Sequence, residues 1–132
     1  MVKTEVRLRI NKAEFTKLLV DAEKITNDAA DYMAEQMKKS IASGAKSGRR
    51  YGSHTSSAPG QSPANWTGKL IRSIKVQKDK NKSFVYVSAK YAEFLEFGTS
   101  KMRPRPFIIP SFIKTKKWFS NKLHRLSYGA KR

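Results

Sequence analysis

The feature that most constrains the fold is a series of apolar side chains, spaced by threes and fours, between Lys12 and about Ser43. This spacing places the apolar side chains on one face of an α-helix. Asn11, with Glu14 three residues later, gives the spacing of an N-terminal capping box. At 1.5 Å per residue the helix would be roughly 45 Å long, which exceeds the diameter expected for so small a domain. The helix should therefore kink, or project at one end and pack against a neighbouring subunit; packing along its own sheet is the alternative. Its apolar positions are Phe15, Leu18, Leu19, Ala22, Ile25, Ala29, Tyr32, Met33, Met37 and Ile41.

Strand patterns occur in three segments. Residues 2–10 alternate apolar and charged side chains, which predicts a half-buried strand. Residues 73–78 and 83–88 indicate a β-hairpin with a lysine-rich tip. The second strand of this hairpin is apolar on both faces, as is typical of a central strand or of one buried at an interface. The expected fold class is therefore α+β, with a small, mainly antiparallel sheet packed by one long N-terminal helix and a C-terminal helix.

The C-terminal segment has the pattern of a basic amphipathic helix. Pro110 is suited to the first helical position, so we expect the helix to begin there. An apolar stripe with lysines on the remaining positions follows, and packing of that stripe in the core is its commonest explanation. Contact with a membrane surface, DNA phosphates or an acidic subunit are the alternatives. The stripe consists of Phe112, Ile113, Trp118, Phe119, Leu123 and Leu126.

Composition limits the classes of function. The chain is expected to form a single domain over residues 1–132, and its 28 Lys and Arg against 10 Asp and Glu give a net charge of +18. So basic a chain calls for an anionic partner, such as nucleic acid, an acidic protein surface or an anionic membrane. It has no cysteine and two histidines, a composition that excludes disulfides and argues against structural zinc. No nucleophile–base pair or phosphate loop is recognisable, so we expect neither an enzyme nor a cofactor. We also expect a soluble protein, because no apolar segment has the length of a membrane span or the form of a signal peptide.

Residues 44–66 are rich in glycine, serine and proline and predict a long flexible loop. Within this loop lie Lys46, Arg49, Arg50 and Tyr51, a basic segment with an aromatic residue. Such a segment can contact a nucleic-acid backbone and stack on bases. It equally suits an arm that becomes ordered on a partner protein. We therefore predict contact with DNA or with a partner here and leave the two alternatives open.

A second distinctive segment spans residues 91–110. Residues 91–97 have helical spacing, and Gly98 is suited to end that helix as a left-handed cap. The three prolines that follow fix the backbone, and Arg103 and Arg105 each precede a proline, which favours extended conformations. The segment therefore predicts a stiff, exposed, cationic arm between two packed segments, suited to holding a partner.

Two motifs resemble a known family. Residues 91–107, YAEFLEFGTSKMRPRPF, are similar to the signature of a phage minor tail protein family, the neck or tail-completion proteins of long-tailed bacteriophages with non-contractile tails. Upstream, Ser57-Ala-Pro-Gly60, Pro63 and Thr67–Ile74 match a second family motif in the expected order. The chain departs from the family pattern at Arg103-Pro104, where a small residue usually precedes Arg-Pro.

The resemblance implies a structural virion component at the head–tail junction, made in the cytoplasm of the bacterial host. It implies a homo-oligomeric ring that joins tail to head around the DNA channel. The expected partners are other copies of the chain, other neck and tail proteins and, non-specifically, DNA in the channel; no membrane partner is expected. The alternative is a basic nucleic-acid-binding protein, which the net charge supports.

The expected functional residues form subunit contacts, with no catalytic or metal-binding site. We hypothesise that Glu93 and Glu96 of one copy pair with Arg103 and Arg105 of the next copy in a ring, as a head-to-tail interface requires. On this hypothesis Arg105→Glu impairs assembly while the monomer stays folded. The alternative is that both acids face solvent or pair within the chain. The full set of expected interface residues is Tyr91, Glu93, Phe94, Glu96, Phe97, Gly98, Arg103, Arg105, Pro106 and Phe107.

Overall fold

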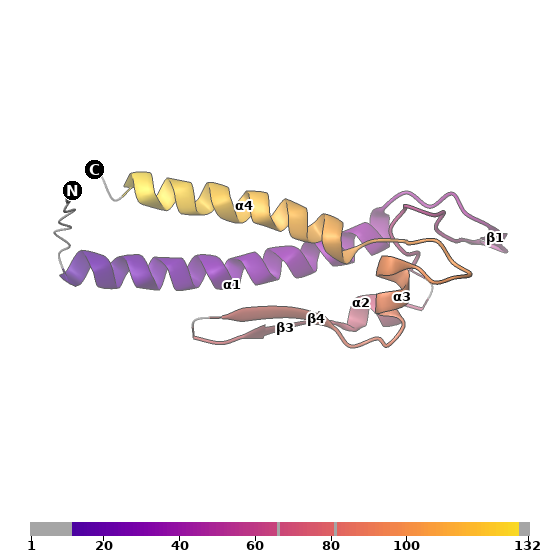
Figure 1. Cartoon of the computed structure of the whole chain (residues 1–132), viewed down its shortest axis with the longest axis horizontal. Coiled ribbons are helices and arrows are strands. Elements are labelled where there is room, and N and C mark those ends of the chain that lie inside the picture. Colours follow the sequence, from indigo (N-terminus) through magenta and orange to yellow (C-terminus); the bar gives the residue numbers. More distant parts are fainter. Residues whose placement is uncertain (1–11, 66, 81, 130–132) are drawn as a thin grey trace, which may run out of the picture.

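The computed structural model describes residues 12–65, 67–80 and 82–129, and one long helix is its central element (Figure 1). Helix α1 (Lys12–Ser43) has the bounds expected from the sequence. A β-hairpin lies along one side of α1, and helix α4 (Ile108–Gly129) lies along the other (Figure 1). The mixed α and β architecture with antiparallel strands is confirmed. The strand expected at residues 2–10 and the cap expected at Asn11 lie outside the described residues.

Only the C-terminal half of α1 is covered by the hairpin. Near the tip of the hairpin, Lys78 Nζ lies 2.6 Å from Asp31 Oδ2, and Ser83 Oγ lies 2.7 Å from Asn27 Oδ1. Side chains of α1 nearer its N-terminus, such as Leu19 and Val20, are exposed. Helix α1 is longer than the hairpin that packs against it. Its N-terminal end therefore projects, as expected from its length.

The hairpin consists of strands β3 (Ile74–Lys78) and β4 (Ser83–Val87), which pair antiparallel with Ile74 opposite Val87. Val76, Val85 and Val87 pack toward the core beneath α1. Phe84 and Tyr86 point to the other face and are half exposed. The described part of this sheet has two strands and leaves the apolar outer face of β4 exposed, so burial of that face at an interface or in a larger sheet stays a prediction.

The core lies where α1, the hairpin and the short helices α2 (Lys69–Arg72) and α3 (Ala92–Phe97) meet. Helix α4 packs along α1, and the rings of Tyr32 and Trp118 stack with centroids 5.0 Å apart at an interplanar angle of 13°. The buried apolar residues of the core cluster are Ala34, Met37, Ile41, Leu70, Ile74, Ala92 and Phe107. No helix among the described residues is long and apolar enough to cross a membrane.

The segment from residue 44 to residue 65 follows a hydrogen-bonded path at one end of the molecule. It contains a minimal hairpin of strands β1 (Arg50–Tyr51) and β2 (His54–Thr55). Lys46 Nζ donates hydrogen bonds to Ser40 O at 3.2 Å, Ser62 O at 2.9 Å and Ser62 Oγ at 2.8 Å. Burial lowers the pKa of this ammonium group below its ordinary value. Lys46 therefore ties both ends of the segment to the end of α1.

Candidate subunit interface

The carboxylate of Glu96 is the polar centre of the segment that resembles the tail-protein signature. Glu96 is 4% exposed, and its oxygens accept three backbone N–H groups from the start of α4. Phe107 N and Ile108 N lie 2.8 and 2.9 Å from Oε2, and Ile109 N lies 2.7 Å from Oε1. A carboxylate is well placed here because N–H groups at a helix start lack partners within the helix and the helix dipole favours negative charge.

Pro110 completes this arrangement. Helix α4 begins at Ile108, two residues earlier than expected, so the prediction that Pro110 takes the first helical position is wrong. The first four N–H positions of a helix need partners from outside it. Counted from Phe107, the residue before the helix, these positions are 107 to 110. Glu96 accepts from the first three, and Pro110, at the fourth, has no N–H group. The start of α4 is therefore satisfied by one side chain from α3 and one proline.

Gly98 ends α3, but not as a left-handed helical cap. Its φ of 77° and ψ of 178° combine a positive φ with an extended ψ, a region reached essentially by glycine alone. A Cβ atom at this position would lie 2.7 Å from Met102 O and 2.9 Å from the nitrogen of Pro104. Gly98 thus allows the arm of residues 98–106 to fold back against the end of α3.

The arm is held at its base by Arg105, which has hydrogen-bond partners within the chain. Arg105 N donates to Leu95 O at 2.6 Å, and Arg105 Nε donates to Ser57 O at 3.2 Å. Arg103, in contrast, is exposed. Glu96 and Arg105 thus both have hydrogen-bond partners within the chain, and their pairing across copies stays a hypothesis. The exposed pair Glu93 and Arg103 remains accessible to a neighbour.

An exposed apolar surface borders these residues. A groove of about 460 Å³ runs between β4, α3, the start of α4 and the middle of α1, and Met33, Val85 and Val87 are among its lining residues. Large exposed side chains stand at its edge and continue along α4, including Phe97 at 67% and Ile113 at 62% exposure. Ile109, Phe112 and Ile113 share one side of α4 because they are spaced by three and four residues. We call this surface the apolar face and define it as Tyr86, Phe97, Ile109, Phe112 and Ile113.

Half of the ten expected interface residues are exposed. Tyr91, Glu93, Phe94, Phe97 and Arg103 are exposed. Gly98, Arg105 and Pro106 are partly buried, and Glu96 and Phe107 are buried. A subunit contact by the exposed residues remains a prediction. Of the loop residues expected to contact DNA or a partner, Arg49, Arg50 and Tyr51 are exposed, whereas Lys46 donates its hydrogen bonds inward.

Sequence reasoning did not find the part of the apolar face that lies on α4. Phe112 and Ile113 were expected to belong to the buried stripe of that helix, and this prediction is wrong. The stripe that faces α1 instead includes Ser111 and Thr115, which can be buried because their hydroxyls donate to Phe107 O and Ser111 O within the helix, each at 2.7 Å. The absence of any acid in α4 gave no indication of which side faces inward.

The surface is suited to binding a macromolecule by apolar contact. Within the described residues, no three His, Cys, Asp or Glu side chains gather as a metal site would require. The pocket between α2, α3 and the loop is lined mainly by hydroxyl, amide and apolar groups, together with His54 and Lys69. What the geometry offers is a rigid apolar face beside an anchored cationic arm.

Comparison with known families decides the assignment. A family model described as "Bacteriophage HK97-gp10, putative tail-component" matches residues 5–98, which is most of the chain. The chain belongs to this family. The resemblance noted in the two sequence motifs is thereby confirmed at the level of a phage tail component, a structural part of the virion.

The matched region of the tail component ends at Gly98. It therefore contains α1, the hairpin, α3 and the carboxylate of Glu96, whereas the arm and α4 lie beyond it. No curated protein and no solved structure shows a significant match to the chain.

Proposed function

We propose that this tail component is a neck or tail-completion protein, which forms a ring at the head–tail junction and helps to join the tail to the head around the DNA channel. The observation that carries the proposal is the apolar face. Tyr86, Phe97 and Ile109 are exposed and line one groove, and the exposed Phe112 and Ile113 continue this apolar surface along α4. Contiguous exposed apolar surface of this kind marks a protein–protein contact.

The face is held rigidly, as a structural contact requires. Glu96 fixes the start of α4 to α3 through three hydrogen bonds, and Phe107, between them, is fully buried. The positions of Phe97 and Ile109 relative to each other are therefore set by the fold. A rigid face loses little conformational freedom on binding.

A closed ring requires two different patches that meet head to tail. The apolar face supplies one patch. The projecting N-terminal end of α1, with Leu19 and Val20 exposed, is available as part of the other. The partners on this proposal are further copies of the chain and the neighbouring neck and tail proteins. A catalytic role has no support in a family of structural tail components.

Electron microscopy of particles from a lysate in which this gene is deleted tests the proposal. We expect filled heads lying apart from finished tails, or tails with a defective upper end. Supplying the gene in trans should restore joined particles. Normal, infectious particles from the deletion would refute the joining role.

A further inference from the structure

Acidic residues are distributed very unevenly along this basic chain. No Asp or Glu occurs from residue 36 to residue 78, and none occurs from residue 97 to the C-terminus. These two segments include the loop that carries β1 and β2, helix α2, and the arm between α3 and α4. They are therefore purely cationic, whereas Lys12–Glu35 mixes acids with bases.

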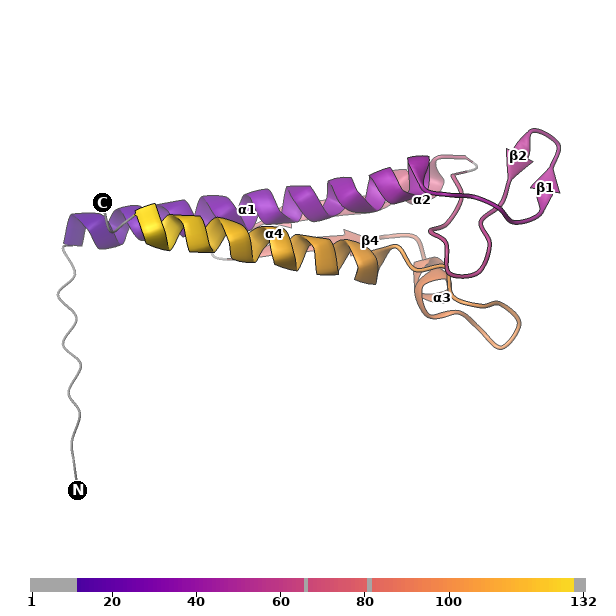
Figure 2. The same ribbon diagram turned by 90° about the horizontal axis from the view of Figure 1, so that it is seen from above.

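The fold brings the loop and the arm together at one end of the elongated molecule (Figure 2). Gly60 N donates to Pro104 O at 2.9 Å, and Arg105 Nε donates to Ser57 O at 3.2 Å. Lys69 of α2 lines a common pocket with Ser57 of the loop and Tyr91 at the start of α3. Segments more than 30 residues apart in the sequence thus share one surface, because these contacts join residue pairs separated by as many as 48 positions.

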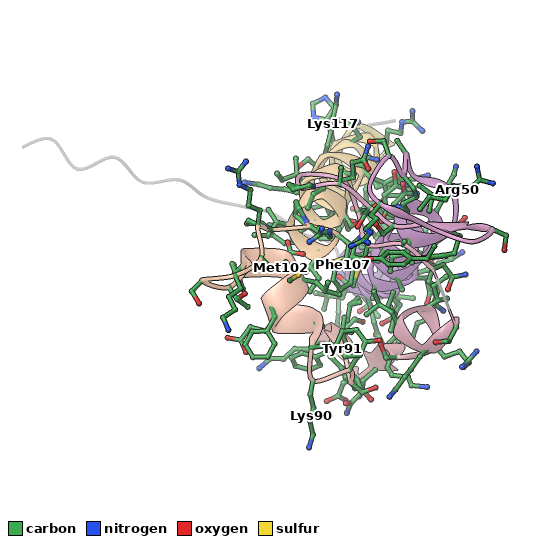
Figure 3. All side chains as sticks on the ribbon, turned by 90° about the vertical axis from the view of Figure 1, so that its right-hand side faces the viewer. Arg50, Lys90, Tyr91, Met102, Phe107 and Lys117 are labelled. Atoms are coloured by element: carbon green, nitrogen blue, oxygen red, sulfur yellow. The ribbon has the colours of Figure 1, made fainter. Side chains whose placement is uncertain are left out.

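Figure 3 looks onto this end, with the loop of Arg50 and the arm of Met102 on its two sides. Glu93, the exposed acid of α3, lines the groove of the apolar face, and Glu96 is buried. We call this surface the cationic end. Its exposed basic residues are Arg49, Arg50, Lys69, Arg72, Lys101 and Arg103.

The side chains of the cationic end suit phosphate. Four of these six residues are arginines, against nine of the 28 basic residues in the whole chain. A guanidinium group presents a planar set of donors that matches phosphate oxygens, and it stays charged at all relevant pH values. Arg49 lies 5.4 Å from the ring centroid of the exposed Tyr51, which supports the guanidinium plane at the surface.

We propose that the cationic end binds the sugar–phosphate backbone of double-stranded DNA without reading its sequence. Backbone contacts of this kind need charge and no base-specific donor pattern. The inference rests on the proposed function only for the source of the DNA, which would be the genome passing through the ring. Binding itself is a property of the isolated chain.

Salt-dependent binding of a random-sequence DNA duplex by the purified protein tests the inference. The test variant is Arg49→Gln/Arg50→Gln/Arg103→Gln. The matched control is Lys80→Gln/Lys82→Gln/Lys117→Gln, which removes the same charge from exposed positions elsewhere. Each phosphate contact contributes about 0.9 to the slope of log affinity against log salt. We expect the slope to fall by roughly two to three in the test variant and by less than about one in the control.

Three results would overturn the inference: no DNA binding by the wild-type protein at low salt, unchanged binding by the test variant, or equal losses in test and control. Unchanged DNA binding by the test variant, together with defective particles when that variant complements the deletion, would assign the cationic end to an acidic protein instead. Because the binding assay needs no ring, normal particles from the gene deletion would refute the joining role and leave the DNA measurement valid.

Discussion

Glu96 shows how the role of one residue depends on a segment that follows it in the chain. From the sequence it is one of two acids on a short helix, equally suited to solvent or to a neighbouring copy. In the structure its oxygens are enclosed by the backbone of residues 107–109. The contact between Glu96 and these N–H groups depends on how residues 98–106 turn back. The spacing of residues in the sequence does not determine that turn. Gly98 was correctly identified as the end of α3, but its extended ψ follows from the close approach of Met102 and Pro104.

Replacing Glu96 with Gln should destabilise the protein. The amide keeps one acceptor oxygen but turns an NH₂ group toward backbone donors and loses the charge that favours a helix start. We expect a loss of about 2–3 kcal/mol in the free energy of unfolding, measured by chemical denaturation. Glu93→Gln, at an exposed position of the same helix, serves as the control and should change stability by less than about 0.5 kcal/mol. Equal losses of stability in the two variants would contradict the role of Glu96 as the cap of helix α4.

Two glycines with positive φ provide a matched test of the arm. Gly98→Ala forces a Cβ to within 3 Å of backbone atoms, whereas Gly52→Ala places its Cβ in open space, although Gly52 also has a positive φ of 63°. We expect Gly52→Ala to cost about 1 kcal/mol from backbone conformation alone. Gly98→Ala should cost at least about 2 kcal/mol. Thermal or chemical unfolding measures both, and similar losses would show that the contact with Met102 and Pro104 relaxes freely.

At the scale of the elements, periodicity predicted most of the fold. The bounds of α1 and the positions of β3 and β4 follow from apolar spacing, because each element buries one face. The inward side of α4 could not be predicted, since two apolar stripes compete on that helix. The polar residues Ser111 and Thr115 lie in the buried stripe by bonding to their own backbone. Composition suggested a long loop at 44–66, but not the β1–β2 pairing or the anchor at Lys46.

Lys46 should make the free energy of unfolding depend on pH. Because burial lowers the pKa of its ammonium group, the folded protein releases that proton at a lower pH than the unfolded chain, whose value is near 10.5. Between these two values the unfolded state binds more protons, so the linked contribution of Lys46 favours folding increasingly as pH rises.

An NMR titration of the lysine side chains should give Lys46 the lowered pKa. Exposed Lys80, on the tip of the hairpin, serves as the reference. In Lys46→Met the rise in stability over this pH window should be smaller than in the wild-type protein. A Lys46 pKa at or above that of the reference would show that the ammonium group is well hydrated.

At the scale of the whole molecule, the apolar face is the feature that the monomer does not explain. Substituting an acid there should block assembly and leave the fold intact, because the side chain is exposed in the monomer. We expect Ile113→Glu to keep the wild-type melting temperature within about 2 °C and to fail to complement the gene deletion.

The control is Asn121→Glu, which adds the same charge at another exposed position of α4 and should complement the deletion normally. Electron microscopy of the complemented lysates, with size-exclusion chromatography of the purified variants, gives the answer. Joined particles with Ile113→Glu would exclude the apolar face from the assembly contact.

The family could be recognised from the sequence, but of the apolar face only Phe97 was expected at a subunit contact. The two motifs pointed to a tail component because glycine, proline and glutamate stand at the spacings of the family signature that they resemble. The structure gives several of these residues roles inside the monomer: Glu96 starts α4, Gly98 permits the turn and Phe107 fills the core. A signature of this kind reports the fold more directly than the interface. The residues of the apolar face come from three elements, and only the tertiary arrangement brings them together.

Charge is distributed unevenly along the long axis of the molecule, so its two ends differ electrostatically. One end of α1 presents acids and bases intermixed, and the other end meets a surface whose basic residues greatly outnumber its exposed acids. Identical copies standing parallel around an axis would add these asymmetries rather than cancel them. The resulting annulus would have two unlike rims, so it could be inserted between two other assemblies in one orientation only. A polyanion threaded along the axis would also feel a different electrostatic potential on entering than on leaving.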